Sequence, residues 1–271
     1  PMMQETPDHA AAPCVSSAHI DAALASKLGA SGLKSMKLGG RDLLPIVQGG
    51  MGIGVSAHRL AGSVAAMGGM GTISCVDIRR HHPDLMERTQ GWSSRVGQDE
   101  ATREAINQAN LEAVEREVKA ARQLSERRGL LAMNVMRAVS DYAGYVKRSL
   151  EAGIDAVVVG AGLPLDLPDL AQDHPKALLI PILSDSRGVQ LIIKKWERKK
   201  RLPDAIVIEH PRLAGGHLGA AKIADLNDPR FDFERVIPEV LAFMRSAGIE
   251  KEIPLIAAGG IRTLADIQRV Q

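Results

Sequence analysis

The sequence predicts an α/β protein in which parallel strands alternate with helices around a closed barrel. Its predicted strands are near-continuous apolar runs, which are typical of parallel strands covered on both faces. Gly-rich or polar residues follow most of these runs, and helix-like segments separate them. A closed βα barrel gathers its functional residues at the carboxyl ends of several strands, whereas a doubly wound sheet places them at one switch point. Candidate residues follow nearly every strand here, so the barrel is the preferred prediction.

Composition indicates a soluble globular protein. The 271 residues are 45% hydrophobic and 24% charged, and this length suits one large α/β domain. A net charge of +2 and an aromatic fraction of 3% give no reason to expect a nucleic-acid or membrane partner. Cys14 and Cys75 are too few for a disulfide framework and fit a reducing compartment. Residues 1–17 lack the features of a signal peptide, so we expect a cytoplasmic protein.

The domain organisation is expected to be simple. Residues 1–40 form an N-terminal arm with a short helix, and residues 41–271 form the barrel. Between the second and third strands lies a long segment, about residues 78–128. It is expected to begin as a polar loop over residues 77–98 and to continue as a helix over residues 99–128.

The elements follow from apolar periodicity and from Gly, Pro and capping residues. Ser56 is a possible cap for the helix that follows it. Strands are expected at 43–47, 71–76, 130–136, 156–161, 177–184, 205–209 and 253–258, and helices at 18–28, 57–67, 99–128, 141–152, 169–174, 188–200, 233–247 and from 263 onward.

A Gly-rich loop after the strand at 205–209 carries the candidate catalytic residue. In Ala214-Gly215-Gly216-His217-Leu218-Gly219, the glycines allow close backbone approach to a ligand. His217 is therefore well placed for an imidazole that must reach a substrate, although a merely exposed loop histidine fits the same pattern. The adjacent His81 and His82 lack a spaced third ligand, so a solvated loop is preferred to a metal site.

The turn Gly259-Gly260-Ile261-Arg262 comes late in the chain and precedes a helix. Barrel enzymes often bind phosphate through backbone N–H groups at such a position. A tight left-handed turn into a helix explains the same residues.

Several motifs together resemble a known family. They are Pro45-Ile46-Val47-Gln48-Gly49-Gly50-Met51-Gly52, Asn134-Val135-Met136, Gly160-Ala161-Gly162-Leu163-Pro164, Ala214-Gly215-Gly216-His217-Leu218-Gly219 and Ala258-Gly259-Gly260-Ile261. In order and spacing, over roughly residues 40–271, the chain resembles the nitronate monooxygenases, formerly called 2-nitropropane dioxygenases. That family also contains the flavin-type enoyl-acyl-carrier-protein reductases.

The resemblance implies a TIM barrel of the (β/α)8 type that holds FMN non-covalently. It also implies that His217 matches the catalytic histidine of the family. The residues expected to bind the cofactor are Gln48, Gly49, Gly50, Met51, Asn134, Gly160, Ser184, Gly215, Gly216, Gly259, Gly260 and Ile261.

Three departures from the family pattern stand out. The family usually has a Glu four residues before the histidine, where this sequence has Leu213. The segment at 78–128 is longer than in short members. The chain ends at Gln271, whereas the family continues to an eighth strand with a second Gly-rich phosphate loop. The sequence as written is therefore expected to lack the last βα unit: either the protein continues beyond it, or this chain has half of the phosphate site.

Three functions are compatible with these residues. The first is FMN-dependent oxidation of alkyl nitronates or nitroalkanes by molecular oxygen, with His217 as base. The second is NAD(P)H-dependent flavin reduction of an enoyl thioester or quinone. The third is a flavin-binding barrel without turnover. The expected partners are a small-molecule substrate and oxygen, and a homodimer is possible.

Overall fold

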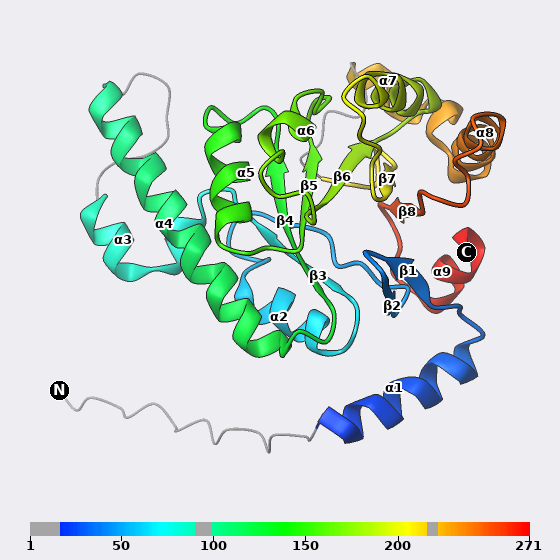
Figure 1. Cartoon of the computed structure of the whole chain (residues 1–271), viewed down its shortest axis with the longest axis horizontal. Helices are drawn as coiled ribbons and strands as arrows, with labels where there is room; N and C mark the ends of the chain where they lie inside the picture. Colours follow the sequence, from blue (N-terminus) through cyan, green and yellow to red (C-terminus); the bar gives the residue numbers. More distant parts are fainter. Residues whose placement is uncertain (1–16, 90–98, 216–221) are drawn as a thin grey trace.

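A curved parallel sheet forms the centre of the molecule (Figure 1). The computed structural model describes residues 17–89, 99–215 and 222–271. Six strands pair in chain order, each parallel to the next: β3 (Met70–Ser74), β4 (Leu130–Met136), β5 (Ala156–Gly160), β6 (Leu178–Leu183), β7 (Ile206–Glu209) and β8 (Leu255–Ala258). The predicted α/β class and parallel strands are confirmed. Within the described residues the sheet is a curled half barrel, so closure into eight units is not shown.

Alternate residues of each strand enter two different apolar clusters. In β4, Leu131 and Met133 pack outward with the helices, whereas Leu130 and Ala132 join an inner cluster. Successive side chains of a strand point to opposite faces, which explains this division. Both faces of the sheet are thus covered by apolar contacts, as continuous apolar strands require.

The strand register brings the carboxyl ends of the strands to one edge. Ser74 pairs with Asn134, and Met136 pairs with Gly160. On the far side, Glu209 pairs with Ala258. We call this edge the carboxyl rim. It is the edge at which βα barrels place their functional residues.

The first predicted barrel strand, at 43–47, is wrong in extent. Instead β1 (Met36–Leu38) and β2 (Arg41–Leu43) form an antiparallel hairpin, and Val47 alone makes a parallel bridge to β3. Gly39 and Gly40 close the hairpin with φ values of 58° and 72°, a conformation that glycine adopts without strain. Leu38 and Leu43 lie in the inner cluster, so the hairpin packs against the barrel interior. The hairpin also spans residue 40, which was the expected boundary between the N-terminal arm and the barrel.

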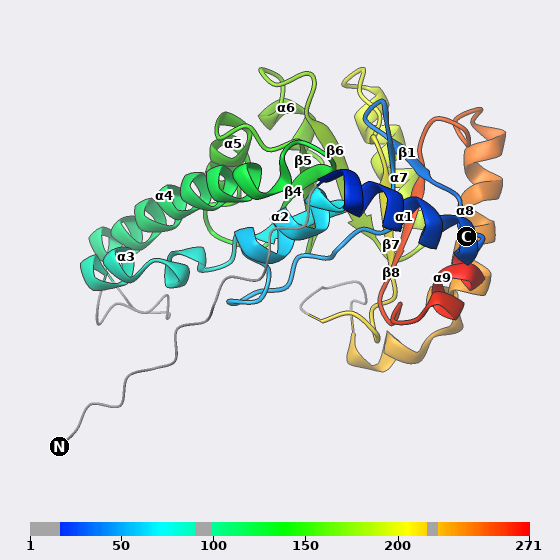
Figure 2. The same ribbon diagram turned by 90° about the horizontal axis from the view of Figure 1, so that it is seen from below.

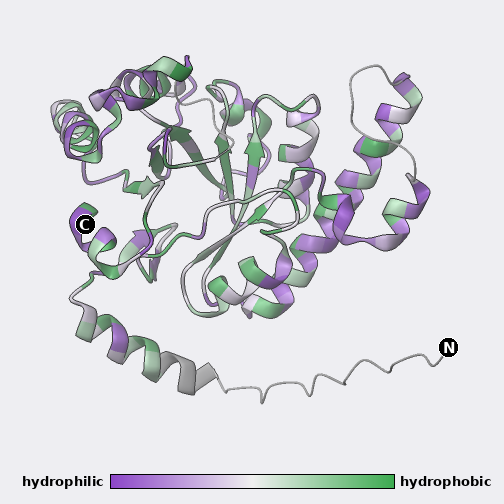
Figure 3. Ribbon diagram, turned by 180° about the vertical axis from the view of Figure 1, so that it is seen from behind, coloured by the Kyte–Doolittle hydropathy of each residue, from purple (hydrophilic) through white to green (hydrophobic). Residues whose placement is uncertain are grey.

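Helices cover the outer side of the sheet and pack against one another in pairs: α2 with α4, α4 with α5, and α7 with α8 (Figures 1 and 2). Hydropathy follows the same layers, since the strands are mostly apolar and the helices carry polar faces (Figure 3). The helices are α1 (Ser17–Ser31), α2 (His58–Ala66), α3 (Pro83–Arg88), α4 (Glu100–Ser125), α5 (Tyr142–Glu151), α6 (Leu167–Leu170), α7 (Ser186–Glu197), α8 (Phe233–Ser246) and α9 (Leu264–Val270), with 3-10 turns at Ile78–His81, Ile223–Asn227 and Pro229–Phe231.

The polar loop predicted at 77–98 is wrong where the structure describes it. Residues 78–81 form a 3-10 turn and residues 83–88 form α3. Arg79 and Leu85 are both 0% exposed. The Arg79 guanidinium lies 3.0 Å from Asp77 and donates to Thr89 over 2.6 Å, so a buried polar cluster organises the segment. Residues 90–98 lie outside the described residues, as does the predicted arm at residues 1–16 with Cys14.

Two searches of the described residues gave negative results. No helix in residues 17–89, 99–215 or 222–271 has both the length and the apolarity for crossing a membrane. Over the same ranges, no group of three or more His, Cys, Asp or Glu side chains is arranged to hold a metal ion.

Candidate functional site

The Gly-rich loop after residue 47 is fastened to β3 by a side chain. The amide of Gln48 accepts from Thr72 N and donates to Thr72 O, each over 3.0 Å, so it pairs with β3 as a backbone peptide would. Ser56 Oγ accepts from Gln48 Nε2 and from Met51 N, each over 2.9 Å. The predicted cap role of Ser56 is therefore wrong: α2 begins after Ala57, and Ser56 instead closes the loop on itself.

Gly50 brings this loop directly onto the end of β4. A Cβ added at Gly50 would lie 2.4 Å from Cβ of Asn134, a distance that no side chain permits. Asn134 is only 5% exposed. Met51, by contrast, is exposed beside this contact. Two of the predicted cofactor-binding residues, Gly50 and Asn134, are thus neighbours at the carboxyl rim.

The ends of β4 and β5 are joined by a backbone hydrogen bond. Arg137 N donates to Gly160 O over 2.8 Å, and Gly160 is buried. Ser184 follows β6 and is also buried, while the next residue, Asp185, caps α7 by accepting from Gly188 N. Gly160 and Ser184 therefore lie at the same rim as Asn134.

The turn after β8 contains two consecutive glycines in the left-handed region of backbone conformation. Gly259 and Gly260 have φ values of 96° and 74°. The N–H groups of Gly259, Gly260 and Ile261 donate no hydrogen bond to a described residue, whereas Asp266 accepts from Arg262 N and Thr263 N. Successive free N–H groups in such a turn suit a phosphate. A phosphate would thus meet the glycine turn, because the N–H groups of the two residues just before α9 already have a carboxylate partner.

The loop after β7 is described only in part. Gly215 is exposed, while Gly216 and the predicted catalytic residue His217 lie outside the described residues. Leu213 is exposed and lies against Gly260, where an added Cβ would be 2.9 Å from Leu213 Cδ1. The loop and the glycine turn are therefore in contact.

Glu209 is a residue at the rim that the sequence reasoning missed. It ends β7 and is 6% exposed. Burial raises the pKa of its carboxyl to about 7. A sequence signal for it exists. Glu209 comes two positions after Val207, whose side chain faces the inner cluster, so alternation along the strand puts Glu209 on the same inner side.

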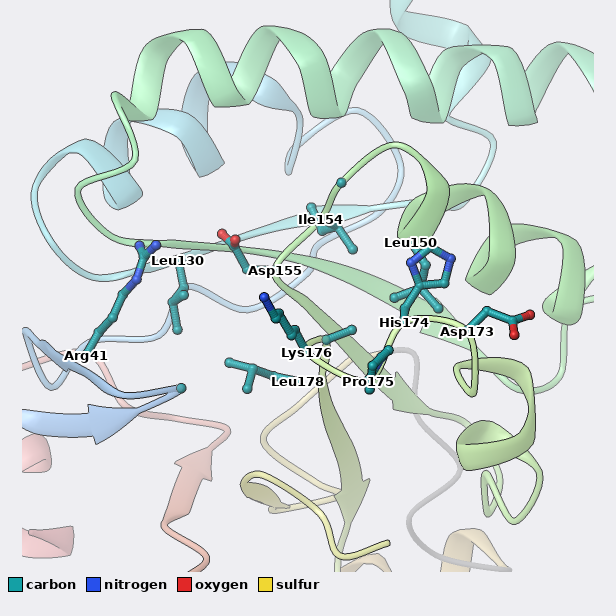
Figure 4. Close-up of a pocket in the computed structure, with 13 residues that line it drawn as sticks. Arg41, Leu130, Leu150, Ile154, Asp155, Asp173, His174, Pro175, Lys176 and Leu178 are labelled. Atoms are coloured by element: carbon teal, nitrogen blue, oxygen red, sulfur yellow. The ribbon is translucent and has the colours of Figure 1, made fainter.

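An open groove of about 800 Å³ lies at the opposite end of the strands (Figure 4). Arg41, Asp155, His174 and Lys176 line it, and none of the predicted site residues does. In βα barrels this end contributes to stability and the carboxyl end to function. We therefore assign the candidate site to the carboxyl rim.

The sequence profile of nitronate monooxygenases matches residues 41–270. The chain belongs to this family. The match covers all the motifs of the carboxyl rim, and it includes β3 to β8, so a nitronate monooxygenase fold accounts for the half barrel. No curated protein sequence matches the chain.

Solved structures share the fold of this nitronate monooxygenase family member. FabK from Thermotoga maritima aligns with a TM-score of 0.56 and 19% identity, over 83% of this chain and 54% of that one. Nitroalkane oxidase from Streptomyces ansochromogenes aligns with a TM-score of 0.54 and 18% identity, over 80% of this chain and 58% of that one. The chain thus spans little more than half the length of either structure.

The carboxyl rim fits a flavin mononucleotide. Gly50 packs directly against Asn134, which brings the backbone of the Gly-rich loop next to a buried side-chain amide. The N–H groups of residues 259–261 suit the phosphate, and the exposed Met51 suits an apolar ring. Since the amide of Gln48 is engaged with β3, its loop would contact the cofactor through Gly49 and Gly50 backbone atoms.

Proposed function

We propose that this protein oxidises alkyl nitronates or nitroalkanes with molecular oxygen, using FMN. The observation that carries the proposal is the family match over residues 41–270, supported by the fit of the carboxyl rim to FMN. Bound FMN would accept electrons from the substrate and pass them to oxygen.

The chain itself would hold the flavin, orient the substrate and remove a proton. Gly50 and Asn134 would lie along the flavin ring, and residues 259–261 would bind its phosphate. His217 would take the α-proton of a neutral nitroalkane. A preformed nitronate has already lost that proton, so it needs His217 only for orientation.

Substituting His217→Asn tests this role. A general base typically contributes about 10²–10⁴-fold to a rate. The variant should lose activity on 2-nitropropane by about that factor, lose much less on propane-2-nitronate, and keep FMN. Oxygen consumption on both substrates and the flavin absorbance spectrum are the measurements.

His174→Asn serves as the matched control, because His174 lines the groove at the opposite end of the strands. It should leave both rates unchanged. Equal rates for wild type and His217→Asn on 2-nitropropane would reject His217 as the base. Rapid NADH oxidation with an enoyl thioester, without nitronate oxidation, would assign the protein to the reductase branch. A protein that binds no FMN would reject both activities.

A further inference from the structure

We propose that Glu117 of α4 is a positioning residue, which holds the Gly-rich loop at residues 48–57 in the shape that binds the flavin. This inference rests on the proposed function, because FMN is the ligand of that loop there. It also gives a role to the long segment at residues 78–128, which the proposed function leaves unused.

The end of the Gly-rich loop needs a partner from elsewhere in the chain. The first N–H groups of a helix have no partner within the helix, and a side chain at the N-cap usually supplies one. The N-cap of α2 is Ala57, which forms no such hydrogen bond. Ser56 Oγ, the nearest alternative, already accepts from Gln48 and Met51. The loop itself therefore leaves the start of α2 uncapped.

Glu117 takes the place of the missing cap. Its Oε2 accepts from the backbone N–H of His58, the first residue of α2, over 2.7 Å and across 59 residues of sequence. A negative charge at the start of a helix is also favoured by the helix dipole. Since α2 packs against α4, the carboxylate reaches this position from the neighbouring helix (Figure 1).

The carboxylate is held in place by burial and by two imidazoles. Glu117 is 1% exposed. His58 Nδ1 lies 2.9 Å from the same Oε2, and His82 Nε2 lies 3.1 Å from Oε1. His82 directly precedes α3. One side chain thus joins the end of the Gly-rich loop to the segment between β3 and α4.

The loop depends on its two ends because its middle has little support. Gln48 fastens the beginning to β3, and the carbonyl of Ser56 accepts from Ser74 N over 3.0 Å near the end. The large apolar side chains between these points are exposed: Met51, Ile53 and Val55. A segment with few buried apolar contacts opens easily unless its ends are fixed. Loss of the Glu117 anchor should therefore lower the fraction of molecules whose loop is ready to bind.

Replacing Glu117 tests this role through FMN affinity. An apparent dissociation constant rises in proportion as the binding-competent fraction falls, so Glu117→Ala should bind FMN about tenfold more weakly. Glu117→Gln keeps an oxygen that accepts from His58 N, and its affinity should stay within about threefold of wild type. Fluorescence titration with FMN is the measurement, at a temperature where near-ultraviolet circular dichroism shows every variant to be folded.

Two control variants separate positioning from general effects. Glu112→Ala removes an exposed carboxylate from the same helix. Val240→Ala opens a cavity in the buried face of α8, so it destabilises the protein without touching the loop. Both should bind FMN as wild type does. Wild-type affinity in Glu117→Ala, or an equal loss in Val240→Ala, would overturn the proposal.

A second measurement needs no flavin. Met51 N donates to Ser56 Oγ, Ser56 N donates to Met51 O, and neither residue forms a hydrogen bond with Glu117. In Glu117→Ala, amide hydrogen exchange should become faster at both N–H groups and stay at the wild-type rate in β4. Unchanged exchange at Met51 and Ser56 would also overturn the proposal. If exchange becomes faster and the wild type binds no FMN, the anchor stands and the proposed function fails.

Discussion

At the scale of single residues, the contact between Gly50 and Asn134 sets the shape of the rim. Both were predicted from motifs, and the order of the motifs was enough to place them together. The inward position of Glu209 was not predictable in the same way. It depends on which face of β7 meets the inner cluster, and that face follows from the pairing of β7 with β6 and β8.

Substituting Gly50→Ala should weaken FMN binding by about tenfold or more. The new Cβ would lie 2.4 Å from Asn134 Cβ, and overpacking of this kind costs about 1–3 kcal/mol. Because this loop would meet the flavin, its displacement should appear as lost affinity in a fluorescence titration. Gly29→Ala, which has open space around it, controls for glycine replacement in general. Wild-type affinity in Gly50→Ala would show that the loop does not contact the flavin.

At the scale of elements, the apolar strands were predictable because a continuous apolar run indicates a strand that is buried on both faces. The hairpin at residues 36–43 was missed because its position depends on an inner cluster built from distant strands. The 3-10 turn at 78–81 was missed for a related reason. The turn depends on Asn110, which lies 31 residues away on α4 and accepts from the backbone N–H of Arg79.

A second buried polar cluster ties α4 to the segments around it. Glu117 is 1% exposed, and its carboxylate lies 2.9 Å from His58 Nδ1 and 3.1 Å from His82 Nε2. Substituting Glu117→Ala should lower the free energy of unfolding by about 1–3 kcal/mol, because it removes the acceptor of the His58 backbone N–H and the partner of the His82 ring. Urea denaturation measures this change. Glu112→Ala, which removes an exposed pair with Arg116 on the same helix, should cost less than about 1 kcal/mol. Similar losses for both variants would contradict a special role for Glu117.

At the scale of the whole molecule, the two ends of the strands have different surroundings. The predicted site residues that the structure describes gather at the carboxyl rim, and the groove in Figure 4 lies at the other end. The motif order predicted this separation, since a parallel sheet puts every strand-to-helix loop at one edge.

This separation predicts opposite outcomes for two substitutions. Gly260→Val introduces a side chain where φ is 74° and where a Cβ would lie 2.9 Å from Leu213, so it should weaken FMN binding strongly. Lys176→Glu reverses an exposed charge in the groove and should leave FMN affinity within about twofold of wild type. Calorimetric titration with FMN compares the two variants. Strong loss in Lys176→Glu would move the cofactor to the groove.

The pairing of Gln48 with β3 also has a consequence for the ageing of the protein. The side chain must both accept from Thr72 N and donate to Thr72 O, which an amide can do and a carboxylate cannot. Deamidation would convert it to glutamate and set a negative oxygen against the carbonyl of Thr72. That single chemical event would release the Gly-rich loop from the sheet while leaving both apolar clusters intact. Old protein would then stay folded and lose its flavin first.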